Sequence, residues 1–234
     1  MNRSCVAATG NVSEHDAPLV SVVVPCYNQA HFLRNVIESA LAQTYPHVEL
    51  VVGDDGSPDN ETDVVANYRV ARYIRQENRG VAEARNTGFR ASNGEFVLFI
   101  DADDRLTPNG VQEHLRCFAE HPEAGFVVGG IEHITGDGSY RGAPHWPVLE
   151  ADHYKHMLAV NHIANTIAVM FRRSVLETVG GFKSIFHPRR IMNCCFGLRG
   201  RFRVRTILRS WHITAVTRRT LRVRGSLCCR QRDV

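Results

Sequence analysis

Short apolar runs alternate with amphipathic segments along the first 130 residues of this chain of 234. Five runs dominated by apolar residues are typical of buried strands: Leu19–Val24, Val48–Val52, Val70–Arg75, Glu95–Ile100 and Gly125–Gly130. Between them, apolar residues recur at helical spacing in four segments: 28–41, with Asn28 as its expected cap, Thr62–Tyr68, Gly80–Ala91 and Pro108–Glu120. Strands that alternate with helices imply crossover connections, so we predict an α/β fold with a mostly parallel central sheet flanked by helices.

The pattern weakens beyond residue 130. The sequence predicts a loop, a helix, a strand and a second helix that ends at Gly180-Gly181; they are Ile131–Trp146, Asp152–Val160, Ile163–Phe171 and Ser174–Val179. Residues 1–18 are polar and aperiodic, which indicates a flexible arm. Past Phe182 no apolar periodicity persists. We therefore expect one domain over 19–182 and a poorly ordered tail over 183–234.

The net charge of +4 is an average over two unlike parts. In residues 183–234, Lys183 and thirteen arginines face the single acid Asp233, a net charge of +13, so residues 1–182 carry −9. No apolar run approaches the roughly 20 residues that span a bilayer. The first 18 residues lack the basic start and apolar stretch of a secretory signal, so we expect a cytoplasmic protein.

Two acidic segments follow predicted strands. Asp101, Asp103 and Asp104 place three carboxylates within four residues, and these repel one another unless a cation lies between them. Hard oxygen ligands of this kind suit Mg²⁺ or Mn²⁺, which often accompany a phosphate-bearing substrate. Asp54 and Asp55 stand at an earlier strand end, where a carboxylate can accept hydrogen bonds from a base or a ribose. The alternative for both segments is an ordinary acidic turn.

A basic helix lies between these segments in sequence. Arg85 and Asn86 fall on the helix predicted after Asn78-Arg79-Gly80, and both could face a diphosphate held between the two acidic loops. The planar guanidinium suits phosphate. A solvated basic helix face is the alternative.

Taken together, the motifs resemble those of the inverting glycosyltransferases of family two, which have the GT-A fold. The matching segments are Val22-Val23-Val24-Pro25-Cys26-Tyr27-Asn28, Val51-Val52-Gly53-Asp54-Asp55-Gly56-Ser57, Asn78-Arg79-Gly80 with Ala84-Arg85-Asn86, and Phe99-Ile100-Asp101-Ala102-Asp103-Asp104. Their order and spacing match over residues 19–135, and Gly180-Gly181-Phe182 resembles a later landmark of the family.

The resemblance implies a nucleotide-sugar half over 19–130 and a partial acceptor half over 131–182. It implies a nucleotide-diphospho-sugar donor, a UDP-sugar for preference, and transfer with inversion in polysaccharide or cell-wall synthesis. Donor-binding roles fall by this resemblance on Pro25, Tyr27, Asn28, Asp54, Asp55, Arg85, Asn86 and Asp103. Metal-binding roles for Mg²⁺ or Mn²⁺ fall on Asp101, Asp103 and Asp104. The acceptor, a saccharide, lipid or protein, is left open.

The general base of the family is missing from its expected place. The resemblance implies an Asp within about a dozen residues after Gly180-Gly181-Phe182, but residues 183–195 contain no carboxylate. When the reading frame is shifted by one base from Arg189 onward, the permitted codons can read Ala-Asp-Tyr-Glu-Leu-Leu-Leu-Arg, which is the expected acidic segment. A second match arises from residues 211–217. Our interpretation is a frameshift between about Phe182 and Arg189.

Several alternatives stay open at this stage. The chain could be active if Glu150 or Asp152 served as base, or it could be a donor-binding but catalytically dead remnant. A nucleic-acid or anionic-membrane binder acting through the tail is a third possibility. No recognisable nucleic-acid-binding module accompanies the arginines, so no specific nucleic-acid partner is expected. Peripheral association with the inner face of the membrane stays open as an alternative. Cys194, Cys195, Cys228 and Cys229 lack the usual spacing of zinc ligands.

Overall fold

The computed structural model describes residues 17–134, 169–182, 203–206 and 213–218. Seven strands form the main sheet, in the order β3-β2-β1-β4-β8-β6-β9. They are β1 (Val20–Cys26), β2 (Val48–Asp54), β3 (Ala71–Arg75), β4 (Phe96–Phe99), β6 (Ala124–Val128), β8 (Val169–Arg172) and β9 (Arg203–Thr206). Only β8 runs antiparallel to its neighbours in this sheet. The predicted mostly parallel sheet is thus confirmed.

A small second sheet lies beside the main one, in the order β5-β10-β7. Its strands are β5 (Asp104–Leu106), β7 (Gly130–Ile134) and β10 (Ile213–Arg218). β10 pairs antiparallel with β5 and parallel with β7.

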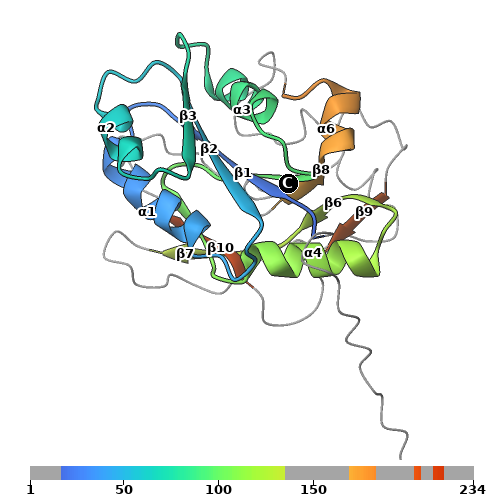
Figure 1. Cartoon of the computed structure of the whole chain (residues 1–234). Helices are drawn as coiled ribbons and strands as arrows, with labels where there is room; N and C mark the ends of the chain where they lie inside the picture. Colours follow the sequence, from blue (N-terminus) through green and yellow to red (C-terminus); the bar gives the residue numbers. More distant parts are fainter. Residues whose placement is uncertain (1–16, 135–168, 183–202, 207–212, 219–234) are drawn as a thin grey trace, which may run out of the picture.

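Helices cover both faces of the main sheet (Figure 1). They are α1 (Ala30–Leu41), α2 (Glu61–Ala66), α3 (Val81–Arg90), α4 (Gly110–Glu120) and α6 (Arg173–Val179). Helices α1, α2 and α4 lie on one side and α3 and α6 on the other (Figure 1). This is the arrangement that right-handed crossovers produce when the chain first moves toward β3 and then returns to β4.

The centre of the sheet is apolar on both faces. Every residue of β1 is buried, with Val22, Val23 and Val24 fully inaccessible to solvent. Because helices cover both faces of β1, a continuous valine run is favoured there over an alternating pattern. β1 pairs with β2 without a register break, from Val20 opposite Val48 to Cys26 opposite Asp54. The carboxyl ends of the two strands therefore lie at one level.

Two glycines allow α3 to approach the sheet closely. A Cβ added at Gly88 would lie 2.4 Å from Cγ1 of Val23, and one added at Gly53 would lie 2.7 Å from the carbonyl oxygen of Ala84. The glycine that interrupts the predicted helix 80–91 is thus a contact point with β1.

Some local predictions were wrong. Asn28 does not cap α1: the helix is preceded by Gln29, no side chain caps it, and Asn28 has a positive φ of 54°. β1 continues through Pro25 to Cys26, and the predicted loop after residue 130 begins with β7. Two strands, β9 and β10, come from the segment expected to be a tail. The helix predicted at 152–160 lies outside the described residues.

We expect the substitution Gly88→Ala to destabilise the protein by about 1–3 kcal/mol, because the new methyl group overlaps Val23 and forces α3 away from β1. Denaturant unfolding measures the change. The double variant Gly88→Ala/Val23→Ala should lose less stability than the two single variants lose in sum, since alanine at position 23 leaves room for the new methyl group. Simple additivity would contradict the close contact.

Candidate functional site

A pocket of about 540 Å³ opens at the carboxyl ends of β1 and β2, beside the loop that follows β4. Its lining contains six of the residues singled out in the sequence: Pro25, Tyr27, Asp55, Arg85, Asp101 and Asp103. The carboxyl ends of parallel strands are where open α/β sheets bind ligands. The pocket is lined in addition by Cys26, Gln29, Asn78, Gly80, Val81 and Ala84.

Asp55 fixes one wall of this pocket. Its Oδ1 accepts hydrogen bonds from the backbone N–H of Arg79 at 2.8 Å and from Gln76 Nε2 at 2.7 Å, and its Oδ2 accepts from the N–H of Gly80 at 2.7 Å. A carboxylate offers about four acceptor positions, so one remains on Oδ2. Asp55 therefore holds the loop before α3 and keeps acceptor capacity toward the pocket.

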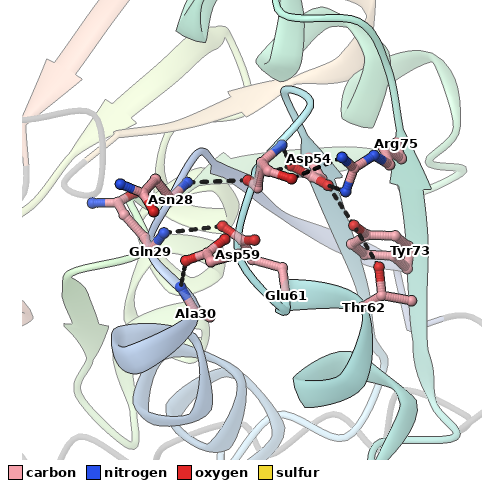
Figure 2. A network of polar contacts seen from close by, with 10 residues as sticks. Asn28, Gln29, Ala30, Asp54, Asp59, Glu61, Thr62, Tyr73 and Arg75 are labelled. Carbon is pink, nitrogen blue, oxygen red and sulfur yellow. Dashed lines mark hydrogen bonds and ion pairs between the residues drawn. The ribbon is translucent and has the colours of Figure 1, made fainter.

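Asp54 does not line the pocket and belongs to a separate network of polar contacts (Figure 2). Its Oδ1 accepts from Ser57 N–H at 2.8 Å, and its Oδ2 accepts from the Tyr73 hydroxyl and from Arg75 Nη1 at 3.1 Å. Burial alone would raise the pKa of Asp54, but the hydrogen bonds from Ser57 and Tyr73 and the charge of Arg75 lower it overall. Asp54 thus stabilises the strand end as an ionised group.

Arg85 and Asp101 form an ion pair inside the pocket. Arg85 is buried, and its Nη2 lies 2.7 Å from Asp101 Oδ1. Its guanidinium also lies over the ring of Phe182, 5.6 Å from the ring centroid. Because Arg85 already has an acid partner, a phosphate group that entered the pocket would have to share this cation with Asp101.

Asp103 is the least compensated acid of the pocket. Burial and the neighbouring charge of Asp101 raise the pKa of Asp103, and only its own backbone N–H acts against them. Asp104, in contrast, lies buried on β5 and does not line the pocket. The structure therefore brings Asp101 and Asp103 together at the pocket and leaves Asp104 outside it.

These acids fit a hard divalent cation. Asp101 and Asp103 supply carboxylate oxygens, the ligands that Mg²⁺ and Mn²⁺ prefer. Burial and, second to it, the charge of Asp101 raise the pKa of Asp103, and a bound cation would offset both effects. Asp101 and Asp103 would hold the ion. Within the described ranges, the three acids at 101, 103 and 104 do not form a group with all ligand atoms within 4.8 Å; Cys26, Asp54 and Glu61 do.

Asn86 forms hydrogen bonds with a segment that is distant in sequence. Its Nδ2 donates to the carbonyl oxygen of Phe182 and its Oδ1 accepts from the N–H of Phe182, both at 2.8 Å. A Cβ at Gly181, whose φ is +75°, would lie 2.5 Å from Asn86 Oδ1. Asn86 thus fastens the Gly180-Gly181-Phe182 segment to α3, and its donor-binding role stays a prediction.

The segment after β1 carries two further predicted residues. Asn28 donates its backbone N–H to Ser57 Oγ at 3.0 Å and does not line the pocket. Tyr27 is 47% exposed and lines the pocket. Sequence reasoning missed Cys26 and Glu61: Cys26 is part of a matching motif, but nothing in the sequence signals that Glu61 folds back toward β1.

Comparison with known proteins agrees with this geometry. The family model described as "Glycosyl transferase family 2" matches residues 21–180. This chain belongs to glycosyltransferase family 2. An uncharacterized glycosyltransferase of Rickettsia felis is 40% identical over 126 residues, which are 52% of this chain and 21% of that protein. One from Nostoc sp. is 34% identical over 173 residues, 68% of this chain and 52% of that protein.

Solved structures show the same fold. TarS 1–349 of S. aureus in complex with UDP has a TM-score of 0.68 at 20% identity, covering 86% of this chain and 60% of that one. The mannosyltransferase PcManGT from Pyrobaculum calidifontis, in complex with GDP-Man and Mn²⁺, has a TM-score of 0.64 at 23% identity, with 89% and 58% covered. The expected GT-A fold is thus confirmed.

The chain spans 21% and 52% of the two curated relatives described above. In the part of the chain that the structure describes, no helix is long and apolar enough to cross a membrane.

The substitution Asp55→Asn should destabilise the protein by about 1–3 kcal/mol, because an amide nitrogen would face a backbone N–H that now has a carboxylate acceptor. Denaturant unfolding measures the loss. Glu77→Gln is the matched control in the same loop, since the Glu77 side chain is 87% exposed. Equal stability of the two variants would show that Asp55 does not hold the loop.

The substitution Asp103→Asn should raise the melting temperature of the metal-free protein near neutral pH by a few degrees. The raised pKa means that ionised Asp103 is disfavoured in the folded state. This penalty is absent below the unfolded pKa of the residue and grows as the pH rises through the higher folded value. The melting temperatures of the parent and of Asp103→Asn, measured from pH 3 to pH 8, should therefore converge at the acid end. A lower melting temperature of Asp103→Asn at neutral pH would contradict this penalty.

Proposed function

We propose that the chain binds a nucleotide-diphospho-sugar, a UDP-sugar for preference, and transfers the sugar with inversion to an acceptor whose identity is open. The observation that carries this proposal is the convergence of Asp55, Arg85, Asp101 and Asp103 on one pocket in a family 2 glycosyltransferase. The UDP and GDP-Man complexes of similar folds support it. A saccharide, lipid or protein hydroxyl would serve as acceptor.

Each side chain would have a separate part in donor binding. The free acceptor position of Asp55 suits an N–H of the base or a ribose hydroxyl, and the exposed ring of Tyr27 suits the base face. Arg85, which now neutralises Asp101 at 2.7 Å, would share its charge with the diphosphate. Pro25 forms part of the same wall.

Asp101 and Asp103 would hold the Mg²⁺ or Mn²⁺ ion. When bound, such an ion neutralises charge that develops on the leaving nucleoside diphosphate. In the protein itself, burial raises the pKa of Asp103 with help from the charge of Asp101, so donor and cation should bind more weakly as the acids become protonated.

Transfer also requires a base that removes the proton of the acceptor hydroxyl. An inverting displacement forms a bond from the acceptor oxygen to the anomeric carbon as the bond to the diphosphate breaks, and the hydroxyl proton passes to a base. Residues 183–195 contain no carboxylate that could take this proton. We therefore propose that donor binding is retained and that transfer is slow.

Calorimetric titration of the full chain with UDP-sugars, with and without Mn²⁺, tests the donor proposal. We expect binding that depends on Mn²⁺ and that weakens at least tenfold, or about 1.4 kcal/mol, in Asp103→Asn. Asp63→Asn is a suitable control because Asp63 is an exposed acid on α2. Absence of nucleotide-sugar binding at every Mn²⁺ concentration would overturn the proposal.

A further inference from the structure

A thiol and three carboxyl groups gather behind the wall of the pocket. Sγ of Cys26, one carboxylate oxygen of Asp54 and one of Glu61 all lie within 4.8 Å of one another, and all three residues are buried. Asp59 approaches the same place, where Asp59 and Glu61 lie beside each other in front of α1 (Figure 2). Two positions along the chain, the end of β1 and the turn after β2, thus meet at this cluster.

One carboxylate oxygen of Glu61 is buried without a hydrogen-bond partner among the described residues. Its side chain is fully buried, and Oε1 accepts a hydrogen bond from the backbone N–H of Gln29 at 2.9 Å. Its Oε2 is buried and has no hydrogen-bond partner among the described residues. Asp59 is similar: Oδ2 accepts from the N–H of Ala30 at 3.0 Å, and the buried Oδ1 has no such partner. Buried carboxylate oxygens without partners are costly.

Positive charge around the cluster is insufficient. Arg75 lies 3.1 Å from Asp54 Oδ2, but its side chain is half-exposed and also donates to the carbonyl oxygen of Ser57. In the described segments, no ion pair joins Asp59 or Glu61 to a basic side chain. The N-terminus of α1 contributes two N–H groups and a partial positive charge, and each N–H already has its acceptor.

We propose that Cys26, Asp54 and Glu61 form a buried site for a thiophilic divalent cation such as Zn²⁺. On binding, the ion would replace the hydrogen bond that Asp54 Oδ1 now accepts from the Ser57 hydroxyl. A thiolate with two carboxylates favours Zn²⁺ over Mg²⁺, whereas the carboxylates of Asp101 and Asp103 favour the harder ion. Zinc–ligand bonds of about 2.0–2.3 Å place ligand atoms roughly 3.5 Å apart, so small side-chain movements would close the site. Cys26 also lines the pocket, which gives the ion a path of entry.

Binding at this site involves the loss of one proton. Burial and the charges of Asp54, Asp59 and Asp55 raise the pKa of the Cys26 thiol to about 12, so the metal-free group is a neutral thiol. The cation would displace this proton into solvent as the sulfur–metal bond forms. It would also join the end of β1 to the start of α2, on the far side of the wall that Asp55 and Tyr27 line.

Cobalt titration of the chelator-treated full chain tests the proposal. Cys5, Cys194, Cys195, Cys228 and Cys229 are first replaced by serine, so that Cys26 and Cys117 remain. We expect a thiolate-to-cobalt charge-transfer absorption band in the near ultraviolet, which Zn²⁺ displaces. Cys26→Ser should abolish the band, and Glu61→Gln should weaken cobalt binding at least tenfold. Cys117→Ser, which changes the second buried cysteine of the described residues, should retain it.

Two further measurements keep the test decisive. Asp103→Asn should retain the band, which separates this site from the proposed donor and metal pocket. Far-ultraviolet circular dichroism confirms that Cys26→Ser is folded, and native mass spectrometry counts bound Zn²⁺ in each variant. A band that persists in folded Cys26→Ser, or no band in the parent, overturns the proposal. A Glu61→Gln protein that is more stable and binds cobalt as tightly as the parent also overturns it. The carboxyl groups of the cluster would then share a proton and would not bind a metal ion.

Discussion

The in-register parallel pairing of β1 and β2 is the constraint on which the site depends. The pairing runs unbroken to Cys26 opposite Asp54, and the next N–H, that of Asp55, donates to the carbonyl oxygen of Cys26 at 2.9 Å. Because side chains alternate between faces, a slip of one residue would exchange the directions of Asp54 and Asp55. The close approach of Gly53 on β2 to the backbone of Ala84 on α3 opposes such a slip, because any other residue at that place would put a Cβ within 2.7 Å of the Ala84 carbonyl oxygen.

Hydrogen bonding separates the acids at this edge of the sheet into two kinds. Asp54 and Asp55 each accept at least three hydrogen bonds from neighbouring loops and side chains, so they hold the structure. At Asp103 only a backbone N–H offsets burial and the charge of Asp101, and Glu61 has a buried oxygen without a hydrogen-bond partner among the described residues. Acids that remain uncompensated after folding gain the most free energy from a nearby cation.

The sequence predicts the strands and the pocket better than it predicts individual roles. Apolar runs and motif spacing led to β1, β2 and β4 and to six residues that line one pocket. Such runs are reliable because burial on both faces requires them. Short strands such as β5, with three residues, carry too little periodicity to be recognised.

Roles that depend on contacts distant in sequence could not be predicted. Asn86 binds the backbone of a residue 96 positions away, and Glu61 reaches Gln29 across 32 positions; neither contact leaves a local pattern. Positive φ at Asn28 likewise follows from the path of the chain toward Ser57. The frameshift interpretation of residues 183–234 stays a prediction.

Anomalous diffraction from crystals grown with Mn²⁺ and a nucleoside diphosphate would locate the ion and the nucleotide in one experiment. We expect a manganese peak between Asp103 and the diphosphate, with the base beside Asp55 and a phosphate oxygen near Arg85. A nucleotide bound away from this pocket, or a manganese peak that does not involve Asp103, would contradict this expectation.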